Sequence, residues 1–270
     1  MSHLTIGGRN LFHRRGGSGE PLLLIMGMSG THLSWGEPFV ADLERDFDVV
    51  AYDHRGIGRS DPETEAFSIV DLADDAAGIL DALGWDSAHV LGISMGGMIA
   101  QELALRHPER IRTLTLGCTY CGGEGSALAP QATIDKLSAG MMSGDREVAI
   151  RNGFEVNVSA AFAAQDDNYA PFRAMAKSLP APIPVIMLQM QAIAQHDTSA
   201  RLPSLDLPTL VVGGDEDAML PVQNGRMIAG LIPDARLEIL AGVGHMFWWE
   251  QPARSAELLR AHALAARATS

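Results

Sequence analysis

Residues 91–97 read Leu91-Gly92-Ile93-Ser94-Met95-Gly96-Gly97, a Gly-x-Ser-x-Gly-Gly pattern. The residues just before it, 88–91, are apolar and β-prone, whereas residues 98–105 have helical preferences. Ser94 therefore falls at the corner between a strand and a helix. Such a corner requires neighbours with almost no side chain, and it lifts the hydroxyl clear of the backbone. The pattern predicts a nucleophilic serine, because a hydroxyl must be exposed beside a base to attack a substrate.

Two other interpretations of this stretch are a glycine-rich turn without chemistry and a loop that cradles phosphate. A Gly-x-Ser-x-Gly pattern alone does not decide between them, because it also occurs by chance. Nucleotide-binding folds use Gly-x-x-x-x-Gly-Lys-Ser/Thr, or Gly-x-Gly-x-x-Gly at a helix near the N-terminus. Neither spacing is met here. The rest of the chain has to decide.

Composition indicates an ordinary globular protein. The 270 residues are 47% hydrophobic and 20% charged, enough for one large α/β domain or two small ones. Lysine and arginine number 20 and aspartate and glutamate 33, which gives a net charge of −13 spread along the chain. Such a surface repels nucleic acid and anionic membranes. The N-terminus shows no signal-peptide pattern, so we expect a cytoplasmic enzyme.

Strand-like and helix-like segments alternate along most of the chain. Apolar strands are followed by amphipathic helices, which is the order of a parallel sheet with helical crossovers, preceded by a short hairpin. The predicted strands are 5–6, 10–13, 22–25, 49–52, 88–91, 111–116, 208–213 and 237–240, and the predicted helices are 35–45, 67–83, 98–105, 221–231 and 252–268.

The alternation breaks between residues 121 and 201, where prolines, methionines and aromatic residues are scattered among alanine-rich stretches. A run this long between two core strands is better interpreted as an inserted helical lid than as a loop. We therefore expect a core of residues 1–120 and 202–270, with a lid at 121–201. The methionines and aromatic residues of the lid either seal it onto the sheet or form an adaptable wall over a substrate cavity.

A nucleophilic serine needs a general base, and histidine is the usual choice because its pKa lies near neutrality. Of the nine histidines, His245 follows the last predicted strand directly and has glycine at 242 and 244. An imidazole also needs a carboxylate to fix its tautomer. Asp217 is our choice, since it lies four residues before the proline that opens the next helix, and Asp215 is the fallback.

Two further groups of polar side chains invite a functional interpretation. Asp53, His54 and Arg55 follow a predicted strand, where catalytic groups often lie, but we favour a role in holding the loop. Cys118 and Cys121 form a lone Cys-x-x-Cys without the further ligands that a zinc site needs. We expect inert, buried thiols there.

With these residues in view, the chain resembles α/β-hydrolase-fold enzymes over essentially its whole length. The order of Ser94, Asp217 and His245 matches that family. Residues 53–60 match its Asp-x-Arg-Gly-x-Gly-x-Ser loop, and Gly244-His245 followed by Glu250 and Pro252 matches its C-terminal signature. The resemblance implies a Ser-His-Asp triad and no metal or cofactor.

The resemblance also implies an oxyanion hole made of two backbone amides, those of Met95 and Met28. One departure concerns the second amide. The family usually has His-Gly before that residue, whereas this chain has Met26-Gly27. A backbone amide does not depend on the missing imidazole, so we expect catalysis to survive and the support of the loop to differ.

The function implied is hydrolysis of a carboxylic ester or lactone through an acyl-enzyme, as in small bacterial esterases and lactonases such as 3-oxoadipate enol-lactonases and aclacinomycin methylesterases. The expected partner is a small or medium hydrophobic substrate, with neither nucleic acid nor membrane. Whether the chain forms a homodimer is left open. The expected pocket is lined by Trp35, Met142, Met175, Phe247 and Trp248.

Other chemistries share this fold. Cofactor-free haloperoxidases or perhydrolases have the same Gly-x-Ser-Met-Gly-Gly pattern, and carbon–carbon bond hydrolases often place tryptophan after the histidine, where this chain has Met246. Ser94 argues against dehalogenases and epoxide hydrolases, which use aspartate as the nucleophile. A hydrolase-fold ligand receptor is the alternative from another functional class.

Overall fold

The structure, a computed structural model, describes residues 1–267. Eight strands form one sheet in the order β1-β2-β4-β3-β5-β6-β7-β8. The first two strands are antiparallel to their neighbours, and all other pairings are parallel. The strands are β1 (Ser2–Ile6), β2 (Arg9–Gly17), β3 (Glu20–Ile25), β4 (Phe47–Tyr52), β5 (Ala88–Ile93), β6 (Ile111–Gly117), β7 (Thr209–Gly214) and β8 (Arg236–Leu240).

The central strands are buried on both faces, as their unbroken apolar sequences predict. In β3, Leu22 and Leu24 belong to the core on one face, whereas Leu23 and Ile25 belong to the core on the other. Every residue of β5 is buried. The carboxyl ends of β5, β6, β7 and β8 therefore meet along one edge of a rigid sheet, where side chains from distant parts of the sequence can converge.

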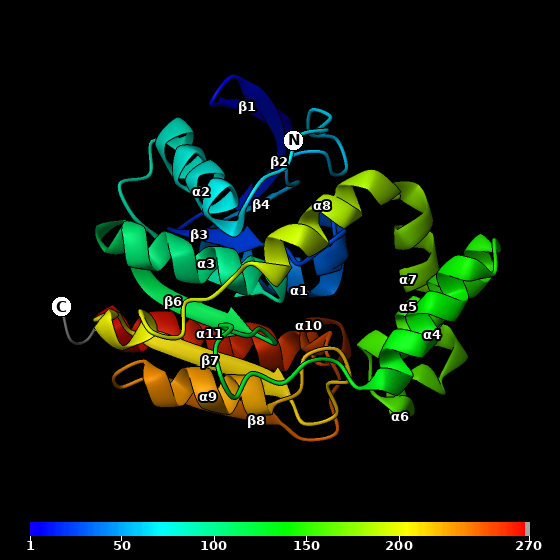
Figure 1. Cartoon of the computed structure of the whole chain (residues 1–270). Helices are drawn as coiled ribbons and strands as arrows, with labels where there is room; N and C mark the ends of the chain where they lie inside the picture. The colour runs from blue at the N-terminus through cyan, green and yellow to red at the C-terminus, as the bar shows by residue number, and fades with distance from the viewer. Residues whose placement is uncertain (268–270) are drawn as a thin grey trace.

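Helices cover both faces of the sheet (Figure 1). One core lies beneath α2 (Ile69–Leu83), α3 (Met95–Arg106) and α9 (Gln223–Leu231). The other lies beneath α1 (Glu37–Leu43), α10 (Phe247–Glu250) and α11 (Pro252–Arg267), and α1 packs against α11. Short 3-10 helices are η1 (His32–Trp35), η2 (Pro108–Arg110) and η3 (Leu202–Ser204).

Five helices are inserted between β6 and β7, and most of them stand beyond one end of the sheet (Figure 1). They are α4 (Gln131–Met142), α5 (Arg146–Asn157), α6 (Ala160–Ala163), α7 (Asp166–Ser178) and α8 (Ile183–Ala194). The last of them, α8, returns to the core: the Tyr120 hydroxyl donates to the carbonyl of Ile193 at 2.9 Å. The helical insertion expected from the sequence is therefore present.

Boundaries differ from the sequence expectation in a few places. The helix expected at 35–45 is shorter in the structure: Trp35 ends η1, Gly36 follows with φ 71°, and α1 covers only Glu37–Leu43. The expected C-terminal helix is present to residue 267, and Ala268 lies outside the described residues. Within residues 1–267, no helix is both long and apolar enough to cross a bilayer.

Candidate active site

Ser94 lies at the corner between β5 and α3, with φ 53° and ψ −124°. This left-handed conformation is rare for a residue with a side chain and stores strain. The surrounding glycines are required by space: a β-carbon on Gly92 would clash with the carbonyl of Gly96, and one on Gly96 with the carbonyl of Ile25. A β-carbon on Gly97 would lie 2.5 Å from that of Thr119. The sequence pattern thus encodes a strained turn packed against neighbouring backbone.

Hydrogen bonds from β6 and the residues after it hold this turn. The Ser94 amide donates to the carbonyl of Gly117 at 3.0 Å, and the Thr119 hydroxyl donates to the carbonyl of Ser94 at 2.7 Å. Both main-chain polar groups of Ser94 are therefore engaged by one neighbouring segment. The Ser94 hydroxyl is therefore the polar group of this residue that remains available for chemistry.

His245 and Asp217 form a buried pair on the loops after β8 and β7. The Nδ1 atom of His245 lies 2.7 Å from Oδ2 of Asp217. Oδ1 of Asp217 accepts the amides of Met219 and Leu220, each at 2.8 Å. A carboxylate held in this way fixes the neutral imidazole as the Nδ1–H tautomer, which leaves Nε2 as an acceptor.

The fallback carboxylate has a different role. Oδ1 of Asp215 accepts the amide of Gly242 at 2.7 Å and ties together the loops after β7 and β8. Asp217 is thus the carboxylate on the imidazole, and Asp215 shapes the turn that leads to it.

The loop that carries His245 is fixed on both sides. The Gly244 amide donates to Oε1 of Glu250 at 2.8 Å, and the Met246 amide donates to the carbonyl of Asn157 at 2.8 Å. The same Glu250 accepts the amide and the hydroxyl of Ser159, at 2.9 and 2.5 Å. Gly242 and Gly244, which flank the approach to His245, therefore belong to a loop tied both to α10 and to the inserted helices.

Electrostatics stabilise the protonated form of His245. Burial of the ring opposes protonation, but the Asp217 carboxylate and the neighbouring Cys118 hold the pKa of His245 well above its ordinary value of 6.5. The charged imidazole is therefore stabilised, which is what an imidazole that takes up a proton during a reaction requires.

Cys118 lies between the serine corner and this pair. It follows β6 directly, and both the imidazole of His245 and the backbone of Ser94 act on its thiol. Burial raises the pKa of the Cys118 thiol, and burial also raises that of Cys121 to about 11. Both cysteines are free and buried. Ser94 and His245 therefore both lie against Cys118.

The described residues contain one cluster with ligand atoms spaced for a metal. A sulfur of Cys118, an oxygen of Asp217 and a nitrogen of His245 lie within 4.8 Å of one another. A metal would need the thiolate and the neutral imidazole. The raised pKa values of both groups oppose that state, so this cluster fits proton transfer better than metal binding.

The loop after β3 passes directly over Ser94. A β-carbon on Gly27 would lie 3.0 Å from the β-carbon of Ser94. The ring Nε2 of His54 lies 2.8 Å from the carbonyl of Met26, which gives this loop a support. The departure from His-Gly in the sequence is therefore accompanied by a different imidazole, supplied from the loop after β4.

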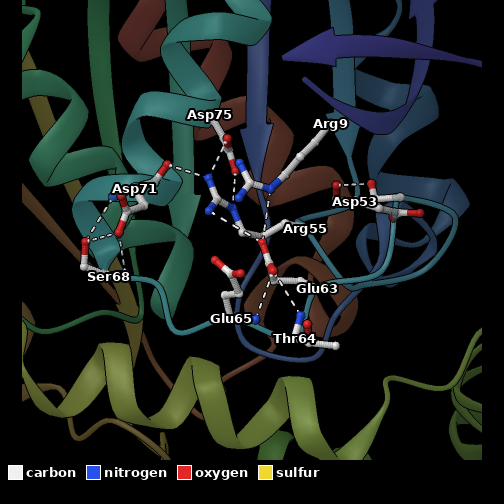
Figure 2. Close-up of polar contacts among 10 residues, drawn as sticks. Arg9, Asp53, Arg55, Glu63, Thr64, Glu65, Ser68, Asp71 and Asp75 are labelled. Carbon is white, nitrogen blue, oxygen red and sulfur yellow. Dashed lines mark hydrogen bonds and ion pairs between the residues drawn. The ribbon is translucent and has the colours of Figure 1, made fainter. Parts of the chain in front are cut away.

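Residues 53–55 hold loops together. Oδ1 of Asp53 accepts the His32 amide at 2.6 Å, and Oδ2 accepts the Arg59 amide at 2.9 Å. Arg55 donates to both oxygens of Asp75, at 2.8 Å each, and thus joins the loop to α2 (Figure 2). Glu63 continues this network through its ion pair with Arg9. These contacts support the structural interpretation of the loop.

The expected pocket residues do not lie together. Trp35, Met175 and Trp248 line a cleft of about 550 Å³ between η1, α7 and α10, and among the described residues its lining includes neither Ser94 nor His245. Phe247 is fully buried in the core, and Met142 is 86% exposed at the end of α4. An apolar residue type alone did not indicate which face of each helix would turn inward.

Sequence reasoning also missed Gln189, on α8. Its side chain is fully buried, and its Oε1 accepts the amide of Ser29 at 2.8 Å, in the loop that passes over Ser94. The sequence feature that could have identified this residue is a glutamine within the mostly apolar segment 183–194. Buried polar side chains in such segments need a partner, so this one predicts a contact.

Comparisons with known proteins agree with this architecture. Residues 20–252 match the family model described as the alpha/beta hydrolase fold. The chain is 30% identical over 250 residues to RutD of Azorhizobium caulinodans, which is named as a carbamate hydrolase, with 92% of each chain covered.

Among solved structures, Est816, an N-acyl homoserine lactone degrading enzyme, is 31% identical with a TM-score of 0.77, covering 96% of this chain and 99% of its own. The enol-lactonase of Burkholderia xenovorans has a TM-score of 0.82 at 24% identity, covering 96% and 98%, and shows likeness of fold alone. Because residues 20–252 match its family model, this chain belongs to the alpha/beta hydrolase fold family.

Proposed function

We propose that the protein is a serine hydrolase that cleaves a carboxylic ester or lactone, with Ser94 as nucleophile, His245 as general base and Asp217 as the carboxylate that orients it. The observation that carries the proposal is the 2.7 Å contact between His245 Nδ1 and Asp217 Oδ2, beside a serine at φ 53°. That contact leaves Nε2 to take the serine proton, and the strained corner presents the hydroxyl.

In the proposed reaction, Oγ of Ser94 attacks the substrate carbonyl while Nε2 of His245 accepts the hydroxyl proton. The imidazolium formed is stabilised by Asp217, and it then protonates the departing alkoxide. Water attacks the acyl-enzyme in the same way and releases the acid. The buried pair supplies this charge stabilisation before the reaction starts, which is where much of a hydrolase's advantage over water arises.

The negative charge on the carbonyl oxygen needs donors of its own. We assign these to the backbone amides of Met95, the first residue of α3, and Met28, in the loop that passes over Ser94. Each such donor contributes roughly 3–4 kcal/mol to transition-state stabilisation in serine hydrolases. Met95 also lies at the N-terminus of α3, where the helix dipole favours negative charge.

The names of the relatives suggest which class of bond is cleaved. Est816 is named for a lactone and RutD for a carbamate, and both are at least 30% identical to this chain. Both bonds are attacked at a carbonyl carbon, so the same triad serves either. We give priority to esters and lactones, and propose that Trp35, Met175 and Trp248, which line the cleft between η1, α7 and α10, contact the apolar part of the substrate.

The test is a series of p-nitrophenyl esters of increasing chain length together with a lactone panel and a simple carbamate, run on the protein and on Ser94→Ala. We expect turnover of an ester or lactone and a loss of about 10⁵-fold or more in kcat for the variant. Retained hydrolysis in Ser94→Ala would refute the proposal. Stoichiometric acylation without turnover would instead indicate a ligand receptor on the same fold.

A further inference from the structure

Gln189 is a buried amide that links the inserted helices to the loop over Ser94. Its side chain has no exposed surface, and its Oε1 lies 2.8 Å from the amide nitrogen of Ser29. The Nε2 atom of the same side chain has no hydrogen-bond partner among the described residues. A buried polar group left half-satisfied is costly, so the hydrogen bond from the Ser29 amide has to offset the cost of burying this side chain.

The residue that Gln189 holds is itself strained. Ser29 adopts φ 60°, a left-handed conformation that a side chain disfavours. Within the loop, the Gly30 amide donates a long hydrogen bond to the carbonyl of Gly27, at 3.3 Å. A hydrogen bond to the Ser29 amide fixes the peptide plane between Met28 and Ser29, and the preceding plane carries the Met28 amide. Gln189 therefore sets the orientation of the backbone on which the proposed oxyanion hole depends.

The helix that carries Gln189 is a firm anchor. At one end of α8, Val185 packs closely on Gly56. A β-carbon added to Gly56 would lie 2.9 Å from the Val185 side chain. At the other end, the Tyr120 hydroxyl donates to the carbonyl of Ile193 at 2.9 Å. Gln189 lies between these two contacts. A side chain fixed in this way can oppose the strain at Ser29 rather than move with the loop.

We propose that Gln189 is a positioning residue of the hydrolase: by accepting the Ser29 amide, it holds the loop of residues 27–30 so that the Met28 amide points at the developing oxyanion. The inference rests on the proposed serine-hydrolase function. Gln189 acts through the loop and not on the reacting atoms, so its removal should weaken binding of the transition state more than binding of the ground state.

The decisive variant is Gln189→Met, which keeps the length of the side chain and removes the acceptor. Gln191→Met is the matched control, because Gln191 is exposed on the same helix. We expect Gln189→Met to lower kcat about tenfold with KM changed less than twofold, since a displaced oxyanion donor is felt mainly in the transition state. The control should stay within twofold of the parent protein in both constants.

A second readout separates positioning from general loss of structure. A trifluoromethyl ketone forms an oxyanion adduct with the serine, whereas the matching methyl ketone remains trigonal. In Gln189→Met, affinity for the first should fall by the same factor as kcat/KM, and affinity for the second should change less than twofold. Equal losses for both inhibitors, or kcat equal to that of the Gln191→Met control, would overturn the inference.

If Gln189→Met does not fold, Gln189→Asn gives the same test, since it retains an amide but is too short to reach Ser29. Melting temperatures matched to the control establish that the comparison is between folded proteins. Failure of this inference is distinguishable from failure of the proposed function. In the first case Ser94→Ala is inactive while the Gln189 variants resemble the control, and in the second case Ser94→Ala itself remains active.

Discussion

Residues 1–267 contain two buried histidine–aspartate pairs that are similar in geometry. His245 Nδ1 lies 2.7 Å from Asp217 Oδ2, and His32 Nδ1 lies 2.9 Å from Asp53 Oδ1. In each pair the aspartate also accepts two backbone amides. A carboxylate that orients an imidazole is therefore not by itself the sign of a catalytic site.

The pairs differ in what else lies against the imidazole. The ring of His32 packs on Phe12, with centroids 4.7 Å apart, and its Nε2 is buried without a hydrogen-bond partner among the described residues. His245 instead lies against Cys118, which also contacts the backbone of the strained Ser94. The comparison teaches that the two pairs differ in what else touches the ring: a thiol that also contacts the candidate nucleophile in one, and an aromatic ring in the other.

The largest expected difference comes from the two histidines themselves. His245→Gln should lower kcat by about 10⁵–10⁶-fold, because the proton of Ser94 then has no acceptor. His32→Gln should stay within about tenfold of the parent rate, because Asp53 still accepts the backbone amides of His32 and Arg59. The measurement is kcat on the best ester from the panel. Similar losses in both variants would show that the two pairs have been assigned the wrong roles.

The aspartates should differ in the same direction, with a smaller factor. Asp217→Asn should lower kcat by about 10⁴-fold with little change in structure, because the amide favours the wrong tautomer of His245. Asp53→Asn should mainly reduce the free energy of unfolding, by about 2–4 kcal/mol, since a fully buried carboxylate loses charge-assisted bonds. Urea unfolding and kcat, measured on both variants, separate the two effects. A catalytic loss in Asp53→Asn larger than that in Asp217→Asn would reverse the comparison.

The sequence predicted the parts of this site that depend on local rules. Ser94 follows from glycines that a tight corner requires, and His245 from its position after the last strand. The choice of Asp217 over Asp215 depended on the offset from a proline. In the structure, Asp217 contacts the imidazole of His245, whereas Asp215 accepts a hydrogen bond from the Gly242 amide.

Other features depend on tertiary packing and had no local signal. Met142 and Met175 are equivalent as sequence, yet one ends α4 in solvent and the other lines a cleft. The orientation of helices in an insertion rich in proline cannot be derived from residue type. His32 likewise lies in no recognisable motif. Its pairing with Asp53 depends on two loops, after β3 and after β4, that the parallel register of those strands brings together.

The pH dependence gives the smallest effect and the closest test of the comparison. A raised pKa for His245 means that the imidazole stays protonated, and unable to accept the Ser94 proton, above its ordinary value of 6.5. The profile of kcat/KM should therefore rise with pH through a midpoint above 6.5, because this ratio reports the free enzyme. The residual activity of Asp217→Asn should have its midpoint at a lower pH, since the neutral amide no longer stabilises the imidazolium while burial still opposes it. Asp53→Asn should keep the parent midpoint. A midpoint that moves with Asp53 and not with Asp217 would place the titrating base at His32, and the assignment of His245 as the base would then fail.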